Sequence, residues 1–522
     1  MKQNLLYLVL CVNLLVGVTS CYEDKSTEAT HLIPEIVIDT TGIGGTKALK
    51  RFERLQINPK VSKEGTDPSN FSYKWMLSLN PISAFTNAYE CISEDPNLNV
   101  EITRDDSETF YRLWLQVTDK TTELRKDMIW DIRVLAPYGE GLLIAEETDG
   151  GTDLALIESK QFTEGYQDEP LIRHNIFSSA NEGAKINADV FQLSSFKQYN
   201  KNKFYILLGK GEDKYIMLAK TYKVMHRNEE GFVEYAVENM NPTQFIVTSG
   251  PAAYLVNDNY VHWMWLGDEN NKTMQWGPSI PNQGEYVEVD KMIAAGLASG
   301  PGYSFYYVPS KGCFKTLYNT TMRWDLATIT DTQKDNWKIV PQNSPNMEMI
   351  YGGLAPDNRV YALMKNKENG SYFIVGQQTK NGYMAGTISD VYLELPECEL
   401  DNAIAFASHE LGNVIYFATK HDIYSIVLNA EPIQVNKVHS FTDEITHMSI
   451  FRQARNTTTT NSATLEDSNQ TILATTWNGT SGTVYAIPIL NFYTGELDFS
   501  SHTKYDDNGG FGKITTVIHQ FP

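Results

Sequence analysis

The sequence predicts an all-β protein in which an immunoglobulin-like β-sandwich precedes a β-propeller of about seven blades. Three observations support this fold class. Aromatic residues reach 11% of the 522 residues, whereas charged residues reach only 20%, and such a balance is typical of sheets. Apolar and polar residues alternate with a period of two across residues 34–136. Hairpin-like patterns then recur through residues 137–522.

The first twenty residues predict a secretory signal peptide. Lys2 makes the start positive, and the apolar run over residues 5–18 is shorter than the roughly 20 residues that a membrane-spanning helix needs. Residues 18–21, Val-Thr-Ser-Cys, resemble a bacterial lipobox, in which Cys21 becomes the acylated N-terminus. Each buried methylene contributes ~0.8 kcal/mol, so several acyl chains anchor a protein firmly. An ordinary signal peptide followed by an unrelated cysteine is the alternative.

Residues 21–33 are mostly polar and predict a lipid-anchored tether. Glu23 and Asp24 make the segment acidic directly after Cys21. This acidic start resembles the export signal of surface-exposed lipoproteins of Bacteroidota. We therefore expect a protein that a lipid holds in the outer membrane and that faces the cell exterior.

Residues 34–136 predict the sandwich. Alternating segments lie at residues 55–59, 71–77, 98–102, 111–119 and 128–135, with polar turns between them. Trp75 stands in mid-strand, where an immunoglobulin-like core places its central aromatic ring. Residues 111–119 resemble the Y-x-L-x-L-x-V-T-D element of PKD domains. A generic sandwich without shared ancestry is the alternative.

Residues 137–522 predict the propeller. Seven hairpins recur, at residues 141–157, 204–218, 254–265, 303–317, 360–375, 414–426 and 472–487. Residues 444–448 and 513–517 repeat a second element in the last two units. One small sheet cannot cover both of its faces, so repeated sheets pack around an axis until the ring closes. Six or eight blades, or a set of unrelated hairpins, are the alternatives. Residues 188–199 and 291–298 are expected to form short helices, and residues 456–468 an inserted loop.

Charge and spacing argue against several functional classes. The net charge of -21 disfavours a nucleic-acid partner, which requires a concentrated basic surface. The five cysteines form no CxxC pair. His409 and Glu410 begin like an H-E-x-x-H zinc motif, but Asn413 stands where the second histidine would be. No G-x-S-x-G, phosphate-binding or dinucleotide-binding motif occurs. We therefore expect no metal, no cofactor and no enzymatic activity, although a pair of carboxylates that meet only in space stays open.

Aromatic residues in loops are the remaining candidates for ligand contact. Trp276 lies in a stretch rich in Gly, Pro and Asn, and Trp477 lies beside a predicted turn. A flat indole ring can stack on a sugar ring or on an apolar peptide side chain. Both tryptophans are therefore ligand-binding candidates, and ordinary core packing is the alternative.

The lipobox at Cys21, the acidic segment, the PKD-like pattern and the repeated hairpins together resemble the PKD-like family lipoproteins of Bacteroidota. The resemblance implies a non-catalytic accessory component of a nutrient uptake complex. It also implies partners: a SusC/SusD-like outer-membrane importer, other surface lipoproteins, and an oligosaccharide or peptide ligand. Two alternatives stay open. One is a propeller hydrolase or lyase that acts on glycans or peptides, and the other is a scaffold without a ligand.

Overall fold

A computed structural model describes most of residues 34–520. The residues outside the described part are 1–33, 42, 83–87, 105–106, 108, 136–137, 199–201, 234–236, 248–251, 268–272, 281–285, 287, 291, 296–302, 319–326, 329–345, 357–358, 379–386, 409, 455–464, 507–509 and 521–522. The predicted signal peptide, Cys21 and the tether therefore lie outside the described residues. The chain divides into two compact units, with the boundary after residue 137.

The described residues of the N-terminal unit form short strands and one 3-10 helix. The helix is η2 (Pro68–Asn70). The strands are β1 (Val37–Asp39), β2 (Thr46–Lys50), β3 (Arg54–Ile57), β4 (Lys60–Ser62), β5 (Phe71–Ser78), β6 (Tyr89–Ser93), β7 (Leu98–Glu101), β8 (Tyr111–Asp119) and β9 (Arg125–Leu135). One five-stranded sheet has the order β2-β9-β8-β5-β6, and β1 pairs with β4 and β3 with β7.

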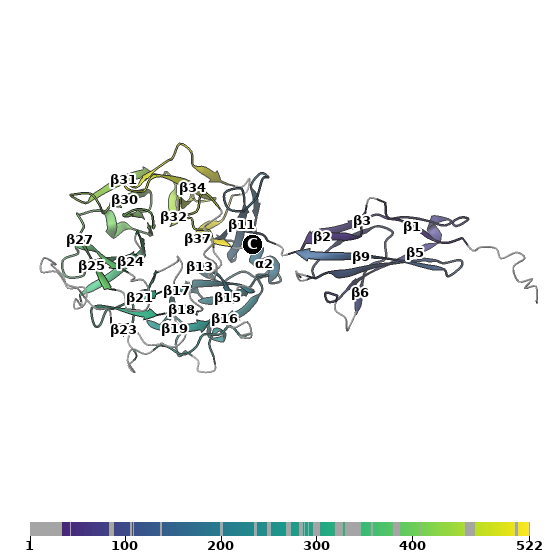
Figure 1. Cartoon of the computed structure of the whole chain (residues 1–522), viewed down its shortest axis with the longest axis horizontal. Coiled ribbons are helices and arrows are strands. Elements are labelled where there is room, and N and C mark those ends of the chain that lie inside the picture. The colour runs from purple at the N-terminus through teal and green to yellow at the C-terminus, as the bar shows by residue number, and fades with distance from the viewer. Residues whose placement is uncertain are drawn as a thin grey trace, which may run out of the picture. The chain divides into compact units, whose positions relative to one another are not determined.

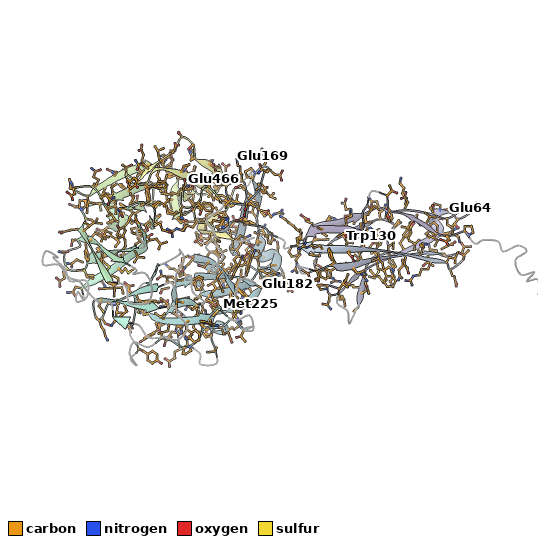
Figure 2. All side chains as sticks on the ribbon, viewed as in Figure 1. Glu64, Trp130, Glu169, Glu182, Met225 and Glu466 are labelled. Carbon is orange, nitrogen blue, oxygen red and sulfur yellow. The ribbon has the colours of Figure 1, made fainter. Side chains whose placement is uncertain are left out.

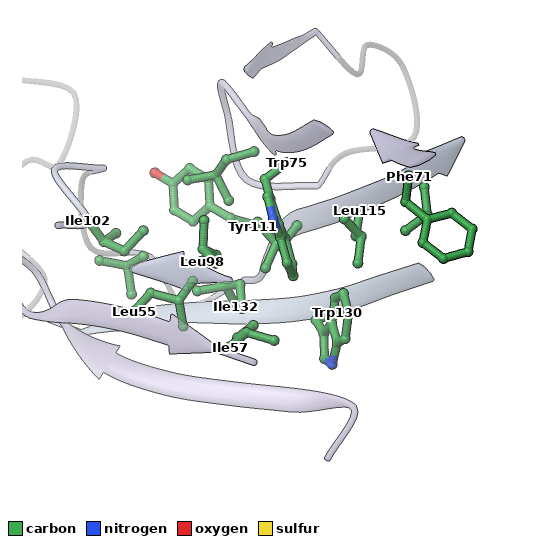
Figure 3. Packing of buried hydrophobic residues seen from close by; sticks show 14 of the residues in the cluster. Leu55, Ile57, Phe71, Trp75, Leu98, Ile102, Tyr111, Leu115, Trp130 and Ile132 are labelled. Atoms are coloured by element: carbon green, nitrogen blue, oxygen red, sulfur yellow. The ribbon is translucent and has the colours of Figure 1, made fainter. Parts of the chain in front are cut away.

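The core of the N-terminal unit follows from the alternation in its strands. Along β8 every second side chain is buried, so the alternating apolar side chains of this strand lie on one face of the sheet. Trp75 and Trp130 stack inside with ring centroids 5.7 Å apart, and Figure 3 shows Leu55 and Ile57 among the residues that pack with them. The Trp75 indole N–H donates to the Asp95 carbonyl at 2.9 Å. The period-two pattern therefore predicted both the strands and their buried face.

The C-terminal unit contains successive antiparallel sheets. The first has β37 (Lys513–Gln520), β10 (Gly141–Thr148), β11 (Gly151–Glu158) and β12 (Leu171–Arg173), and the second has β13 (Ala188–Gln198), β14 (Asn202–Gly211), β15 (Tyr215–Ala219) and β16 (Val224–Arg227). The third has β17 (Pro242–Val247), β18 (Ala252–Asn257) and β19 (Tyr260–Trp265). The fourth has β20 (Met292–Ala295), β21 (Tyr303–Val308), β22 (Cys313–Tyr318) and β23 (Ala327–Thr328).

Three more sheets complete this order. The fifth has β24 (Met347–Ala355), β25 (Arg359–Asn366), β26 (Tyr372–Gln378) and β27 (Thr387–Glu394), and the sixth has β28 (Ala405–Ser408), β29 (Val414–Ala418), β30 (Asp422–Val427) and β31 (Gln434–Ser440). The seventh has β32 (Glu444–Ile450), β33 (Thr471–Trp477), β34 (Gly482–Asn491), β35 (Glu496–Leu497) and β36 (Thr503–Tyr505). Helix α2 (Ile176–Ala180) and the 3-10 helices η3 (Asn228–Gly231) and η4 (Glu399–Asn402) lie between strands. The all-β prediction is confirmed, and each of the seven predicted hairpins forms two neighbouring strands of one sheet.

Figure 1 shows the sheets of this unit arranged around one centre, with one strand of each sheet nearest to that centre. We call β37, β13, β17, β20, β24, β28 and β32 the inner strands. Each inner strand contacts the inner strands of the sheets before and after it, and β37 contacts both β13 and β32. The first sheet therefore contains both the first strand of the C-terminal unit, β10, and its last strand, β37. These two strands pair antiparallel. Figure 2 shows the side chains that the sheets carry.

Most inner strands contain a β-bulge at a corresponding position. In five of them the strand pairing skips one residue, namely Phe191, Thr243, Ile350, Thr446 and Thr515. An extra residue shifts the alternation by one, so residues three apart reach the same face. Ile445 and Met448 thus enter one core cluster, and Ile514 and Val517 enter another. The bulge explains why residues 444–448 and 513–517 are similar in sequence.

The predictions of short helices over residues 188–199 and 291–298 are wrong. Residues 188–198 form the inner strand β13, and residues 292–295 form β20. In β13 the buried residues Val190, Leu193 and Phe196 are spaced by three, which resembles a helical pattern. The bulge at Phe191 brings Val190 and Leu193 to one core cluster, and Phe196 enters a cluster on the opposite face. The loop expected over residues 456–468 lies mostly outside the described residues.

Among the described residues, no helix is long and apolar enough to cross a membrane. Cys91, Cys313 and Cys398 all carry free thiols.

A half-buried histidine with an enclosed ring nitrogen, beside one bulge, gives a prediction about pH. The ring nitrogen Nε2 of His447 is enclosed and has no hydrogen-bond partner in the described part of the chain, and burial lowers the pKa of His447 to about 4. An unfolded histidine titrates near 6.5, so between pH 6.5 and 4 the unfolded state binds the extra proton. As the pH is lowered from 6.5 to 4, we therefore expect the free energy of unfolding of the C-terminal unit to decrease by up to about 1.4 kcal/mol per pH unit.

Urea titrations of the wild type and of His447→Gln at several pH values measure this slope. The variant is expected to lose the His447 contribution and to retain the contributions of the carboxylates. Parallel curves for the two proteins between pH 6.5 and 4 would contradict a buried neutral His447.

Candidate functional site

The C-terminal ends of five inner strands meet at one place, which we call the axial end. It comprises the ends of β13, β24, β28, β32 and β37 and the residues that follow them. The Ser195 hydroxyl donates to the His519 carbonyl at 3.3 Å, and Arg452 Nη2 donates to the Ser408 carbonyl at 2.9 Å. The hydroxyls of Tyr351 and Ser408 lie 3.1 Å apart. Because the inner strands run in the same direction, residues far apart in the sequence converge here.

His519 and Glu140 form the buried part of the axial end. The Ala454 backbone N–H donates to His519 Nδ1 at 2.9 Å, so Nδ1 is an acceptor and the proton is on Nε2. His519 Nε2 lies 2.9 Å from the Phe162 carbonyl and 3.4 Å from Glu140 Oε1. Both imidazole nitrogens therefore have structural partners, and in this arrangement Nδ1 cannot accept a proton from a substrate without breaking its bond to Ala454.

The Glu140 carboxylate is held in its ionised form. It accepts hydrogen bonds from the Glu164 backbone N–H at 2.7 Å and from Gln453 Nε2 at 3.0 Å. Burial alone would raise the pKa of Glu140, but the hydrogen bonds from His519, Glu164 and Gln453 together lower it. A carboxylate with a lowered pKa is a poor general acid near neutral pH.

Two half-buried cations belong to the axial end. Burial lowers the pKa of Lys197, and the negative charge of Glu140 opposes that shift. Arg452 is also half-buried, and its Nε donates to Asn469 Oδ1 at 3.2 Å. Partly desolvated cations attract anionic and polar groups more strongly than cations in bulk water do. The axial end can therefore contribute positive charge in a chain whose net charge is -21.

Two stacked tyrosines support the end of β37. Tyr205 and Tyr222 have ring centroids 4.8 Å apart and an interplanar angle of 12°. Both phenols donate to Gln520 Oε1, Tyr205 at 3.3 Å and Tyr222 through a short hydrogen bond. Burial raises the pKa of Tyr205 to about 12 and that of Tyr222 well above its usual range. The phenols therefore stay protonated and act as donors that fix Gln520.

The structure corrects the expectation for Trp276. Its side chain is 0% exposed and packs against Phe245 and Tyr215, with ring centroids 5.8 and 6.5 Å away. The Trp276 backbone N–H donates to the Gly231 carbonyl at 2.7 Å and the Trp276 carbonyl accepts from Val233 at 3.0 Å, which holds the residue against the second sheet. A fully enclosed indole cannot stack on a ligand.

Ligand contact by Trp477 and acylation of Cys21 stay predictions. Trp477 is half-buried at the end of β33, where it pairs with Gly482 on one side and Glu444 on the other. Cys21 lies outside the described residues. The structure does not bring Trp477 to the axial end.

The described part of the chain contains no group of three or more His, Cys, Asp or Glu side chains placed to hold a metal ion. Asn413, which replaces the second histidine of the zinc motif, accepts from the Tyr361 hydroxyl at 2.7 Å and donates to Asn429 at 2.7 Å. His409 lies outside the described residues. Asn413 thus has a structural role between the fifth and sixth sheets.

Sequence reasoning missed the axial end. Its members come from residue 140 to residue 520 and share no local motif. The only sequence signal was the similarity of residues 444–448 to residues 513–517, because both segments begin inner strands that lead to this end.

Comparison with known proteins identifies one family match. The sequence model of the PKD-like family matches residues 21–193, which span residues 21–137 of the N-terminal unit and the start of the C-terminal unit, and it confirms the predicted PKD-like domain. No curated protein matches the sequence.

Three solved structures show distant similarity to the chain. Hsv2p of Kluyveromyces lactis has 7% identity and a TM-score of 0.35, over 72% of this chain and 94% of that chain. Dihydro-heme d1 dehydrogenase NirN has 8% identity and a TM-score of 0.33, over 77% of this chain and 72% of that chain. The N-terminal eight immunoglobulin domains of Down syndrome cell adhesion molecule have 9% identity and a TM-score of 0.14, over 91% of this chain and 59% of that chain.

Proposed function

We propose that this chain is a lipid-anchored surface protein of the outer membrane and a non-catalytic accessory component of a SusCD-like nutrient uptake complex. Its cargo is an oligosaccharide or a peptide. The family match begins at residue 21, the cysteine whose acylation the lipobox predicts. This coincidence supports the division of the chain into a cleaved leader, an anchored cysteine and an exported body.

We also propose that the seven sheets are the blades of a propeller closed by β37. The closed circuit of contacts among the inner strands supports this arrangement. So does the strand order, in which each sheet continues outward from its inner strand. Pairing the two ends of a ring in one blade protects edge strands that would otherwise stay open.

The observation that carries the binding role is the convergence of polar side chains at the axial end. Lys197 and Arg452 contribute half-buried positive charge there, and the internal hydrogen bonds of His519 and Glu140 occupy the groups that acid–base catalysis would require. A site of this kind is suited to binding polar cargo without converting it.

The anchor is tested by Cys21→Ser. Cells are grown with an alkyne-labelled fatty acid, and the protein is followed in membrane and soluble fractions. We expect the wild type to carry the label and to sediment with the outer membrane, whereas the variant loses both properties, because only the acylated cysteine is proposed to hold the chain there. Cys91→Ser changes an exposed thiol of the N-terminal unit and is the matched control. Membrane retention of Cys21→Ser would contradict the anchor.

The partner and the absence of catalysis are tested together. Affinity purification from detergent-solubilised outer membrane is expected to recover a SusC/SusD-like importer with the chain.

Incubation of the purified chain with mixed polysaccharides and with mixed peptides is expected to leave both substrates intact. Recovery of the chain alone would overturn the uptake role, and turnover that a single carboxylate substitution abolishes would establish a hydrolase or lyase instead.

A further inference from the structure

A group of half-exposed aromatic rings lies where the sixth and seventh sheets adjoin. His439 is in β31 and Phe441 follows that strand, Tyr485 is in β34, and Phe499 and His502 lie between β35 and β36. We call these five residues the aromatic cluster. Four of them are half-buried and His502 is exposed, whereas the stacked pair Trp75 and Trp130 and the pair Tyr205 and Tyr222 are almost fully buried.

The rings of the cluster hold one another in place. His439 stacks on Phe499 with ring centroids 3.6 Å apart and an interplanar angle of 12°. Phe441 lies 4.7 Å from His439 and 5.0 Å from Tyr485, and Tyr485 lies 5.7 Å from His502. Burial, and then the charge of His502, lowers the pKa of His439, which favours a neutral ring. The cluster is therefore a preformed aromatic surface.

Polar groups border this surface at the Tyr485 hydroxyl. Burial raises the pKa of Tyr485, and the charges of Lys504, Asp443 and Asp506 act on the same hydroxyl. Lys504 Nζ lies 2.5 Å from Asp506 Oδ2, so the positive charge of the lysine is paired. The border therefore offers a phenol donor and carboxylate acceptors, with an excess of negative charge.

We propose that the aromatic cluster binds a pyranose ring of a neutral glycan. A sugar ring has an apolar face that stacks on an aromatic surface and an edge of hydroxyls that donate to carboxylates. An anionic sugar would be repelled by Asp443 and Asp506. An apolar peptide side chain would gain most from an enclosed pocket rather than from a surface bordered by charges. The inference rests on the proposed function and specifies glycan rather than peptide as its cargo.

The test is affinity electrophoresis of the purified full-length mature chain in native gels that contain laminarin, xyloglucan, galactomannan or pectic galactan, with polygalacturonate as the anionic comparison. We expect at least one neutral polysaccharide to retard the wild type and polygalacturonate to leave it unchanged. Tyr485→Ala and His502→Ala are expected to weaken binding by about tenfold each, measured by calorimetry with the matching oligosaccharide, because each removes one stacking ring.

Two further variants separate binding from folding. Tyr485→Phe keeps the ring and removes only the hydroxyl, so a smaller loss is expected. Tyr493→Ala removes an aromatic ring that is 68% exposed outside the cluster, and unchanged retardation is expected. Thermal unfolding of every variant shows whether the C-terminal unit stays folded.

Two outcomes would overturn the inference: no retardation by any of the four neutral polysaccharides, or equal retardation of the wild type and both alanine variants. These outcomes are distinguishable from a failure of the proposed function. The importer and anchor experiments do not depend on the cluster, and the gels contain neither importer nor membrane.

Discussion

A chain that ends at Gly512 is expected to lose the folded C-terminal unit. The truncation removes β37, whose Ile514 and Val517 enter the core of the first and seventh sheets. It also removes His519 and Gln520, which hold Glu140 and the tyrosine pair. Each buried apolar side chain contributes roughly 1.5–3 kcal/mol, so the loss approaches the total stability of about 5–15 kcal/mol of an ordinary domain.

Circular dichroism and calorimetry measure the effect. The truncated chain is expected to lose one of two thermal transitions and to retain that of the N-terminal unit, whose core cluster contains only residues between 36 and 134. A chain that ends at Gln520 retains β37 and is the matched control. Addition of a peptide with residues 510–522 is expected to restore the lost transition. A truncated chain with both transitions at their original temperatures would show that β37 does not close the unit.

Replacement of Lys63 by methionine is expected to destabilise the N-terminal unit strongly. Lys63 Nζ lies 2.5 Å from Asp119 Oδ2, and both side chains are almost fully enclosed. Asp119 also accepts from the Thr121 backbone N–H and from the Thr122 hydroxyl, each at 2.8 Å. Removing Lys63 leaves the buried Asp119 carboxylate without an opposite charge, and the two remaining hydrogen bonds compensate for its burial only in part. We expect the melting temperature of this unit to fall by at least about 10 °C.

The same ion pair gives a pH dependence with a defined sign. The hydrogen bond from Lys63 and the bond from the Thr121 amide hold the pKa of Asp119 well below its usual range. The stabilisation is therefore complete above the ordinary aspartate pKa and is lost as the pH falls toward the lower value of the folded state. Scanning calorimetry between pH 7 and 2 measures it, and Asp119→Asn is expected to remove it.

An exposed lysine in the strand directly before Lys63 is the control. Lys60 lies in β4, three residues before Lys63, and its side chain is exposed. Lys60→Met is expected to change the melting temperature by less than about 3 °C, since surface substitutions have small effects. If Lys60→Met and Lys63→Met lower the melting temperature equally, the enclosed pair does not provide the stability assigned to it.

Local patterns of the sequence were sufficient for the strands. Residues 111–119 alternate because β8 buries one face, and the seven hairpins occur because two apolar segments separated by a short polar turn pair with each other. These signals lie within about 20 residues, where side-chain alternation and turn residues act directly. The PKD-like element at residues 111–119 belongs to the same class of signal, and it lies within the residues that the PKD-like family model matches.

By itself the sequence determined the all-β class, the hairpins and the alternating core of the N-terminal unit. Residues 18–21 also resemble a lipobox, and the acylation of Cys21 stays a prediction. Only the tertiary structure decided that Trp276 is enclosed and that β13 is a strand, because a bulge and the packing of neighbouring sheets set which faces are buried. It alone brought β37 to β10 and assembled the axial end and the aromatic cluster. These features depend on contacts between residues tens to hundreds of positions apart, and no local periodicity encodes such contacts.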